Sequence, residues 1–220
     1  MKKVLVSAAL ALVFIPFIAG AAEENSAKAK ELADAVWKTS GGENWSKVKS
    51  IDFTFNVEKD GKTVASAEHH WDVAAQTDQV KWKGKEVTVN LADPASSEDD
   101  KAAYARWVND SYWLLAPLKL KDHGVNLTDE GKKEMNGVER ETLLLSFGEV
   151  GLTPKDNYRL YINPETKLVE SWDYMPEPGT SKHATWTAYE KSGGLTLATD
   201  HQMDGGIRIQ IKNLKVNTRQ

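Results

Sequence analysis

The segment that decides the fold is residues 51–62, which read IDFTFNVEKDGK. Ile51, Phe53, Phe55 and Val57 alternate with polar residues, and this period of two is typical of a β-strand with one buried face. The Asp-Gly pair near the end of the segment is favoured in the tight turn of a β-hairpin. The segment therefore predicts a strand that reverses direction and begins an antiparallel sheet.

The same alternation recurs along the chain, where Gly, Asn, Asp and Pro separate short apolar runs. Because the runs are short and joined by tight turns, we expect an antiparallel sheet of about eleven strands. The candidate strands span residues 51–57, 65–71, 79–83, 87–91, 125–128, 138–147, 158–162, 168–174, 183–189, 195–201 and 207–214.

Two segments have helical spacing instead. Apolar side chains recur every three or four positions in residues 27–38, and the Gly pair at 41–42 is a stop signal. A second, strongly aromatic helix begins at Glu98, after the favoured N-cap residue Ser97, and ends at Pro117. Because the apolar face of each strand must be covered, the sequence predicts a β-rich α+β fold. In it, a curved antiparallel sheet forms an unclosed half-barrel wrapped around these central helices.

Composition and charge exclude several classes of protein. The chain has 220 residues with 28 Lys and Arg against 32 Asp and Glu, and this net charge of −4 argues against a nucleic-acid partner. The absence of Cys excludes a disulfide scaffold, a thiol nucleophile and an iron–sulfur site. No change in composition marks a domain boundary, so we expect a single domain over residues 22–220. Eight Trp against five Phe is the unusual feature.

Residues 1–21 predict a cleaved secretory signal. Lys2 and Lys3 precede an apolar run, and small residues follow near the expected cut at Ala21 or Ala22. The apolar run is shorter than the roughly 20 residues that a membrane-spanning helix needs. Cleavage removes two lysines and no acidic residue, which leaves 26 basic against 32 acidic residues and a net charge of −6. We expect a periplasmic protein that does not span a membrane.

The sequence carries no common catalytic signature: G-x-S-x-G, P-loop and H-E-x-x-H patterns are all missing. His69 and His70 are neighbours on a predicted strand, so their side chains should point to opposite faces. His201 could approach His69 across the sheet, with Glu68 or Asp200 as a further metal ligand, but a histidine at the surface or core edge is the simpler interpretation. We predict no catalytic residue, no metal site and no cofactor.

The aromatic residues are a better lead to function. They gather on the middle helix and its exit, on strand faces, and before the Pro/Gly-rich loop at 176–179. Trp and Met adapt to acyl chains without needing fixed polar partners, although these side chains could instead simply fill the core of a wide curved sheet. The residues predicted to line a ligand cavity are Trp71, Trp82, Trp107, Tyr112, Trp113, Leu114, Leu115, Trp172, Tyr174, Met175 and Trp186.

Three short stretches are similar to segments of a known family. They are residues 112–120 (YWLLAPLKL), 122–125 (DHGV) and 160–167 (LYINPETK). With these stretches and the order of its elements, the chain resembles uncharacterised members of the periplasmic lipoprotein carrier (Lol-type) superfamily. Those proteins combine a secretory signal, an N-terminal helix and an unclosed antiparallel barrel with helices as a lid. The resemblance implies an apolar cavity that holds acyl chains, and it implies no catalysis.

The predicted function is a periplasmic carrier or binding protein for an apolar ligand, either a lipid or the acyl chain of a lipoprotein. The alternative is a non-catalytic cell-envelope interaction module with a packed interior and an envelope protein as its partner. An enzyme would require histidines and carboxylates that converge in a pocket, and no spacing in the sequence singles out such a group. An unfilled apolar cavity between the middle helix and the sheet would favour the carrier, whereas a packed interior would favour the interaction module.

Overall fold

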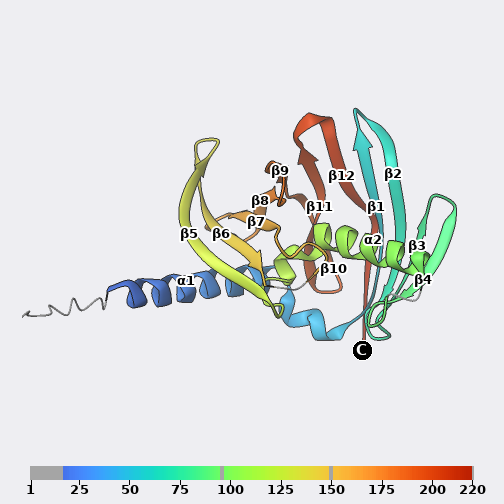
Figure 1. Ribbon diagram of the computed structural model, residues 1–220, viewed down its shortest axis with the longest axis horizontal. Coiled ribbons are helices and arrows are strands. Elements are labelled where there is room, and N and C mark those ends of the chain that lie inside the picture. The colour runs from blue at the N-terminus through green and yellow to red at the C-terminus, as the bar shows by residue number, and fades with distance from the viewer. Residues whose placement is uncertain (1–16, 95–96, 149–150, 220) are drawn as a thin grey trace, which may run out of the picture.

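The computed structural model describes residues 17–94, 97–148 and 151–219 (Figure 1). One curved antiparallel sheet contains the twelve strands of these residues, with two α-helices packed on its apolar side. The predicted fold class, an unclosed sheet around central helices, is confirmed. The helices are α1 (Phe17–Thr39), α2 (Glu98–Leu115) and the short 3₁₀ turns η1 (Gly42–Lys47), η2 (Ala116–Leu118) and η3 (Asp204–Gly206). The strands are β1 (Val48–Lys59), β2 (Lys62–Asp72), β3 (Thr77–Trp82), β4 (Lys85–Asn90), β5 (Val125–Met135), β6 (Val138–Phe147), β7 (Asn157–Ile162), β8 (Val169–Met175), β9 (Lys182–Thr185), β10 (Thr187–Ser192), β11 (Leu195–Met203) and β12 (Ile207–Thr218).

The strand order places the two ends of the folded chain side by side in the sheet. The order is β4-β3-β2-β1-β12-β11-β9-β8-β7-β6-β5, and β10 pairs with β11 off this path. β1 pairs with β12 over its whole length, from Val48 opposite Thr218 to Lys59 opposite Ile207. Among the described strands, the edge strands β4 and β5 do not pair with each other, so the sheet stays open.

The described residues form one strand more than the sequence predicts, because the expected strand at 183–189 is interrupted at Trp186. The backbone N–H of Trp186 donates to the carbonyl of Glu170 on β8 at 2.8 Å, and its indole is buried. Two residues later Ala188 has a positive φ of 52°, which bends the chain away. β9 therefore remains paired with β8, whereas β10 pairs only with β11.

Local sequence signals set most of the other boundaries. In the β1–β2 turn Asp60 and Gly61 have φ values of 51° and 75°, as the predicted Asp-Gly hairpin requires. The side chain of Ser97 accepts a hydrogen bond from the backbone N–H of Asp100 at 3.1 Å and caps α2 at the expected residue. Helix α1 is longer than the predicted 27–38, because the strong helix formers Ala and Glu extend it towards its N-terminus. Of the expected signal segment, residues 1–16 lie outside the described part of the chain, and residues 17–21 belong to α1.

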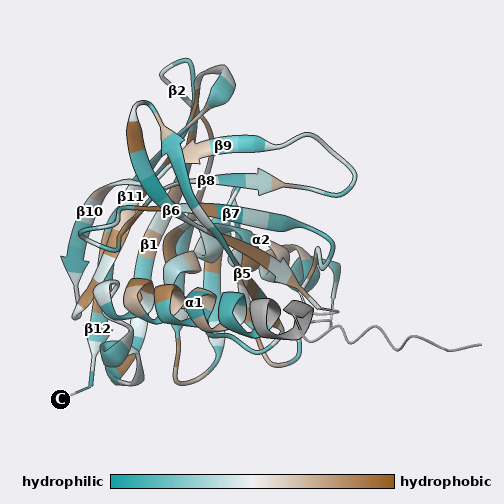
Figure 2. Cartoon of the chain, turned by 90° about the vertical axis from the view of Figure 1, so that its left-hand side faces the viewer, coloured by the Kyte–Doolittle hydropathy of each residue, from teal (hydrophilic) through white to brown (hydrophobic). Residues whose placement is uncertain are grey.

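The two helices cover different parts of the sheet. Helix α1 packs its buried Ala29, Ala33 and Val36 in the cluster that contains the β6, β7 and β8 side chains, and its apolar and polar bands alternate in Figure 2. Helix α2 lies between the two halves of the sheet. Leu114 packs with apolar residues of β1, β11 and β12, whereas Tyr112 packs with those of β6 to β8. Opposite faces of α2 therefore hold the two halves of the sheet together.

The turn after α1 gives a testable prediction about stability. Gly41 has φ +84°, and a Cβ atom there would lie 2.2 Å from the carbonyl oxygen of Gly194. Gly61 has a similar φ of +75° with nothing within 4 Å of such a Cβ. We expect Gly61→Ala to cost about 1–2 kcal/mol through its left-handed backbone alone. Gly41→Ala should cost clearly more, because the backbone of the β10–β11 turn must also move. Chemical denaturation of the two variants measures both costs, and equal costs would contradict the close approach.

Candidate functional site

One face of α2 forms a wall of a pocket on the β6–β8 side of the sheet. Ala105, Val108, Asn109, Tyr112 and Trp113 are spaced three and four residues apart, so they share one side of the helix. All five line the same pocket. Ala105 and Asn109 are exposed at its mouth, whereas Tyr112 and Trp113 are partly buried deeper in the fold.

The strands supply the opposite wall of this pocket. Phe147 ends β6, Tyr158 lies on β7, and Trp172 and Tyr174 lie on β8, where alternate residues share the face that looks towards α2. Gly151, Leu152 and Thr153 complete the lining. The pocket has a volume of about 270 Å³, just below the roughly 300–1,000 Å³ typical of small-molecule sites.

The aromatic rings of the pocket pack against one another in fixed geometries. The ring centroids of Tyr112 and Trp172 are 5.9 Å apart and nearly parallel, and the Trp113 ring meets that of Trp172 edge-on at 4.7 Å. The ring centroid of Tyr158 lies 5.1 Å from that of Tyr112 and 5.1 Å from that of Tyr174. Rings that hold one another in this way lose little side-chain freedom when an apolar ligand arrives.

The pocket is uncharged. No Asp, Glu, Lys, Arg or His is among the described residues that line it. Burial raises the pKa of Tyr112 well above its ordinary value, and burial likewise raises the pKa of Tyr158. The pKa of Tyr174 is raised to about 12, first by burial and then by its hydrogen bond to Asp156 at 2.7 Å. All three phenols are therefore neutral at physiological pH, and the lining suits an apolar, uncharged group.

The structure brings four of the eleven predicted lining residues together in this pocket: Tyr112, Trp113, Trp172 and Tyr174. Met175 follows at the partly buried end of β8. The other six lie outside this pocket. Trp186 is buried beneath Trp172, with ring centroids 5.0 Å apart. Trp71, Trp107, Leu114 and Leu115 belong to the cluster of β1, β11 and β12, and Trp82 packs at the edge of the cluster of β2, β3 and β4.

The sequence analysis missed the remaining lining residues for identifiable reasons. Ala105, Val108 and Asn109 lie one and two helical turns before Tyr112, so projecting the helix from Tyr112 would have found them. Phe147 and Tyr158 alternate in phase with apolar neighbours on their strands, but a period of two does not distinguish a pocket wall from a filled core. The loop residues 151–153 carried no signal.

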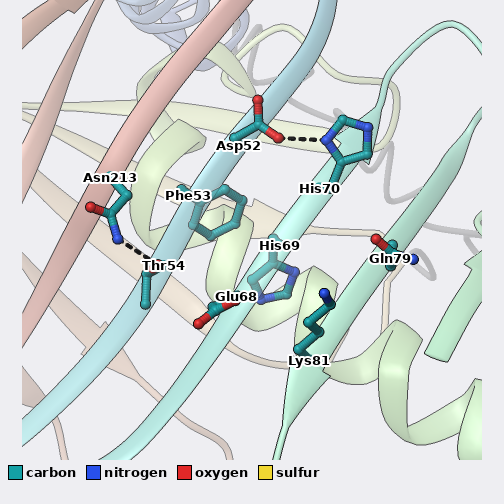
Figure 3. Close-up of a pocket in the computed structure, with 9 residues that line it drawn as sticks. All are labelled: Asp52, Phe53, Thr54, Glu68, His69, His70, Gln79, Lys81 and Asn213. Atoms are coloured by element: carbon teal, nitrogen blue, oxygen red, sulfur yellow. Dashed lines mark hydrogen bonds and ion pairs between the residues drawn. The ribbon is translucent and has the colours of Figure 1, made fainter. Parts of the chain in front are cut away.

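The two neighbouring histidines point to opposite faces of β2, as predicted. His69 is buried on the α2 side. His70 is exposed on the outer face, where its Nδ1 lies 2.5 Å from Asp52 Oδ1. Figure 3 shows His70 beside Asp52, with the His69 ring next to Phe53. The outer face is hollowed here, and a second pair of polar side chains, Thr54 and Asn213, is joined by the other dashed contact.

The proposed approach of His201 to His69 is not observed. His69 lies between Asp78 and Asp110, whereas the ring of His201 packs against those of Trp113 and Trp186. Within the described residues, no group of three or more His, Asp or Glu is arranged to hold a metal ion. Both rings are buried, and neither lines the pocket between α2 and strands β6 to β8.

Comparison with known proteins places the fold. No protein-family profile matches the sequence, and no curated protein sequence is detectably similar to it. A solved structure of a DUF1329 family protein from Desulfovibrio piger is similar with a TM-score of 0.51 at 12% identity, over 86% of this chain and 93% of that one. An outer membrane lipoprotein-sorting protein domain from Vibrio parahaemolyticus is similar with a TM-score of 0.51 at 10% identity, over 89% of this chain and 95% of that one. A LolA superfamily protein from Nitrosomonas europaea has a TM-score of 0.47 at 8% identity, over 86% of this chain and 94% of that one.

These similarities concern the architecture of the chain. At 10–12% identity they show that the open sheet and its helices are shared with the two proteins of TM-score 0.51. The unclosed antiparallel sheet with helices that the resemblance implies is therefore confirmed, and the similarities show this fold alone. In the part of the chain that the structure describes, no helix is long and apolar enough to cross a membrane.

His201, whose ring packs against Trp113, gives a prediction about acid sensitivity. Its Nδ1 donates to the Thr185 carbonyl at 3.1 Å, and burial lowers its pKa to about 4. The unfolded chain binds this proton at a pKa of about 6.5, so stability falls as the pH drops from 6.5 towards 4. The two pKa values correspond to a loss of about 2 kcal/mol between pH 7 and pH 5.

The variant His201→Phe keeps a ring in this position and removes the titration. Between pH 7 and pH 5, we expect the unfolding free energy of the wild type to fall by about 2 kcal/mol more than that of His201→Phe. Urea denaturation at the two pH values measures this difference independently of any constant cost of the substitution. An identical pH dependence in both proteins would show that His201 is not held neutral by burial.

Proposed function

We propose that this chain is a periplasmic binding or carrier protein that holds an apolar ligand, a lipid or the acyl chain of a lipoprotein, between α2 and strands β6 to β8. The observation that carries the proposal is the uncharged aromatic pocket, whose walls come from one face of α2 and from three strands. Burying an acyl chain there gains about 25 cal/mol for each Å² of apolar surface removed from water.

The volume of the pocket limits the size of the ligand that it can hold. A volume of about 270 Å³ suits a single acyl chain or part of one, and not a complete lipid with two chains. Leu152 at the rim is 53% exposed, so it adds an apolar contact where the ligand would leave the pocket. We therefore propose that the remainder of the lipid or lipoprotein stays outside, next to Leu152.

Two further observations support a carrier in the cell envelope. The N-terminal sequence predicts a signal cut near Ala21 or Ala22, which would deliver the chain to the periplasm and leave α1 shortened at its start. One of the proteins with the same fold is described as an outer membrane lipoprotein-sorting domain. The mass of the protein recovered from a periplasmic extract tests the cut, because cleavage removes about 21 residues.

Ligand binding can be tested with a matched pair of helix variants. Ala105 and Ala102 are both exposed on α2, but only Ala105 lines the pocket. The uncharged dye N-phenyl-1-naphthylamine, whose fluorescence rises in apolar surroundings, serves as the probe. We expect Ala105→Trp to fill the mouth and weaken dye binding about tenfold or more, which corresponds to about 1.4 kcal/mol. Ala102→Trp should bind the dye like the wild type.

Native mass spectrometry of the purified wild-type protein provides the second readout, as a mass increment from co-purified lipid that Ala105→Trp lacks. A protein that carries no lipid and binds neither dye nor added lipid would contradict the proposal. That result would favour the alternative, a non-catalytic interaction module with a packed interior. Equal dye binding by both Trp variants would show that the dye binds outside this pocket.

A further inference from the structure

A buried, charged cluster joins the pocket helix to the other half of the sheet. His69 on β2 lies between two carboxylates: its Nδ1 is 2.7 Å from Asp78 Oδ2 on β3, and its Nε2 is 3.1 Å from Asp110 Oδ2 on α2. The three side chains are at most 2% exposed. Phe53 on β1 stacks on the imidazole with its ring 4.6 Å away and 9° from parallel. The proposed ligand pocket does not include this cluster.

Between two ionised aspartates, this geometry requires a positively charged histidine. A carboxylate only accepts hydrogen bonds, and a neutral imidazole has a single N–H to donate. Both contacts of His69 are therefore hydrogen bonds only when both ring nitrogens carry a proton. Arg106 on α2 approaches Asp110 Oδ2 at 3.3 Å, so the two carboxylates, Arg106 and the imidazolium add up to no net charge. Loss of the His69 proton would leave a buried negative charge, which is costly.

The cluster is connected to the pocket through Asp110 and its neighbour. Asn109 lines the mouth of the pocket and donates from Nδ2 to Asp110 Oδ1 at 2.8 Å. Asp110 itself points away from the pocket, towards β2 and β3. Because α2 is a rigid element, the contact of Asp110 with His69 fixes where the opposite face of the helix stands relative to Tyr158 and Trp172.

We propose that His69 is a positioning residue for ligand binding: its imidazolium anchors α2, through Asp110, in the position that forms the pocket. The proposal rests on the proposed function, because it assigns His69 a role in binding at that site. His69 touches no ligand and acts only through the helix.

The direction of the pH dependence follows from the surroundings of His69. Burial opposes its charge, but the hydrogen bonds to Asp110 and Asp78 outweigh burial and raise the pKa of His69 above its ordinary 6.5. The groups that face it are Asp78 from β3, Asp110 with Arg106 from α2, and the uncharged ring of Phe53 from β1. The anchor is therefore complete below pH 6.5 and is lost as the pH rises through the pKa of the folded protein.

The adjacent histidine offers a matched control. His69→Gln removes the buried cation, whereas His70→Gln changes an exposed side chain that pairs with Asp52 on the outer face. Binding of N-phenyl-1-naphthylamine, which stays uncharged, is measured from pH 6 to pH 9. We expect the wild type and His70→Gln to bind several-fold more weakly at pH 9 than at pH 6. His69→Gln should bind weakly at pH 6 already and show no such change.

Hydrogen–deuterium exchange of α2 amides, compared with those of β7, is the second readout and needs no ligand. In the wild type, α2 should lose protection relative to β7 as the pH rises, once the intrinsic pH dependence of exchange is subtracted. If His69→Gln fails to fold, Asp110→Asn replaces it, because this variant removes one of the two carboxylates that hold the charge. We expect the wild-type transition to move to lower pH in Asp110→Asn.

The outcomes separate the two proposals. A wild type that binds no dye at any pH, but whose α2 still loosens with pH, contradicts the proposed function and leaves His69 as the anchor of the helix. Dye binding and α2 protection that are both independent of pH contradict the role of His69. A pH dependence lost in His70→Gln would assign the effect to the outer face instead.

Discussion

The structure depends on the burial of α2 between the two halves of a sheet that does not close. An open sheet leaves one apolar face uncovered, and the strands cannot bury it against each other as they do in a sandwich. Helix α2 meets this requirement on two sides, with Leu114 against β1, β11 and β12 and Tyr112 against β6 to β8. The pocket exists where the second contact is incomplete. The pocket and the contact that joins the two halves of the sheet therefore share one helix.

Local patterns in the sequence predicted the strands, the Asp-Gly turn and the Ser97 cap, because each depends on neighbouring residues. The break at Trp186 was not predictable, since it depends on a hydrogen bond to Glu170 on another strand. The aromatic surplus predicted four residues of the pocket but could not separate them from Trp107, which is equally aromatic and faces the packed side.

The charged cluster was missed because its members are far apart in the sequence. Asp78 and Asp110 are 9 and 41 residues from His69, and the sequence analysis weighed Glu68 and Asp200 in their place. A signal was nevertheless present. Asp78 shares a strand face with the apolar residue Val80, and Asp110 follows Trp107 by three positions on α2. An acid on an otherwise apolar face requires a buried partner, and a histidine on the apolar face of the adjacent strand is a natural candidate.

The pairing of β1 with β12 has a consequence for how the chain acquires its structure. The partners in this central ladder are about 150 to 170 residues apart, as for Lys59 with Ile207 and Val48 with Thr218. Closing so long a loop costs entropy before any of the ladder is gained, which places the protein among the slower folders. A chain in which β12 has not yet been synthesised cannot complete the middle of its own sheet.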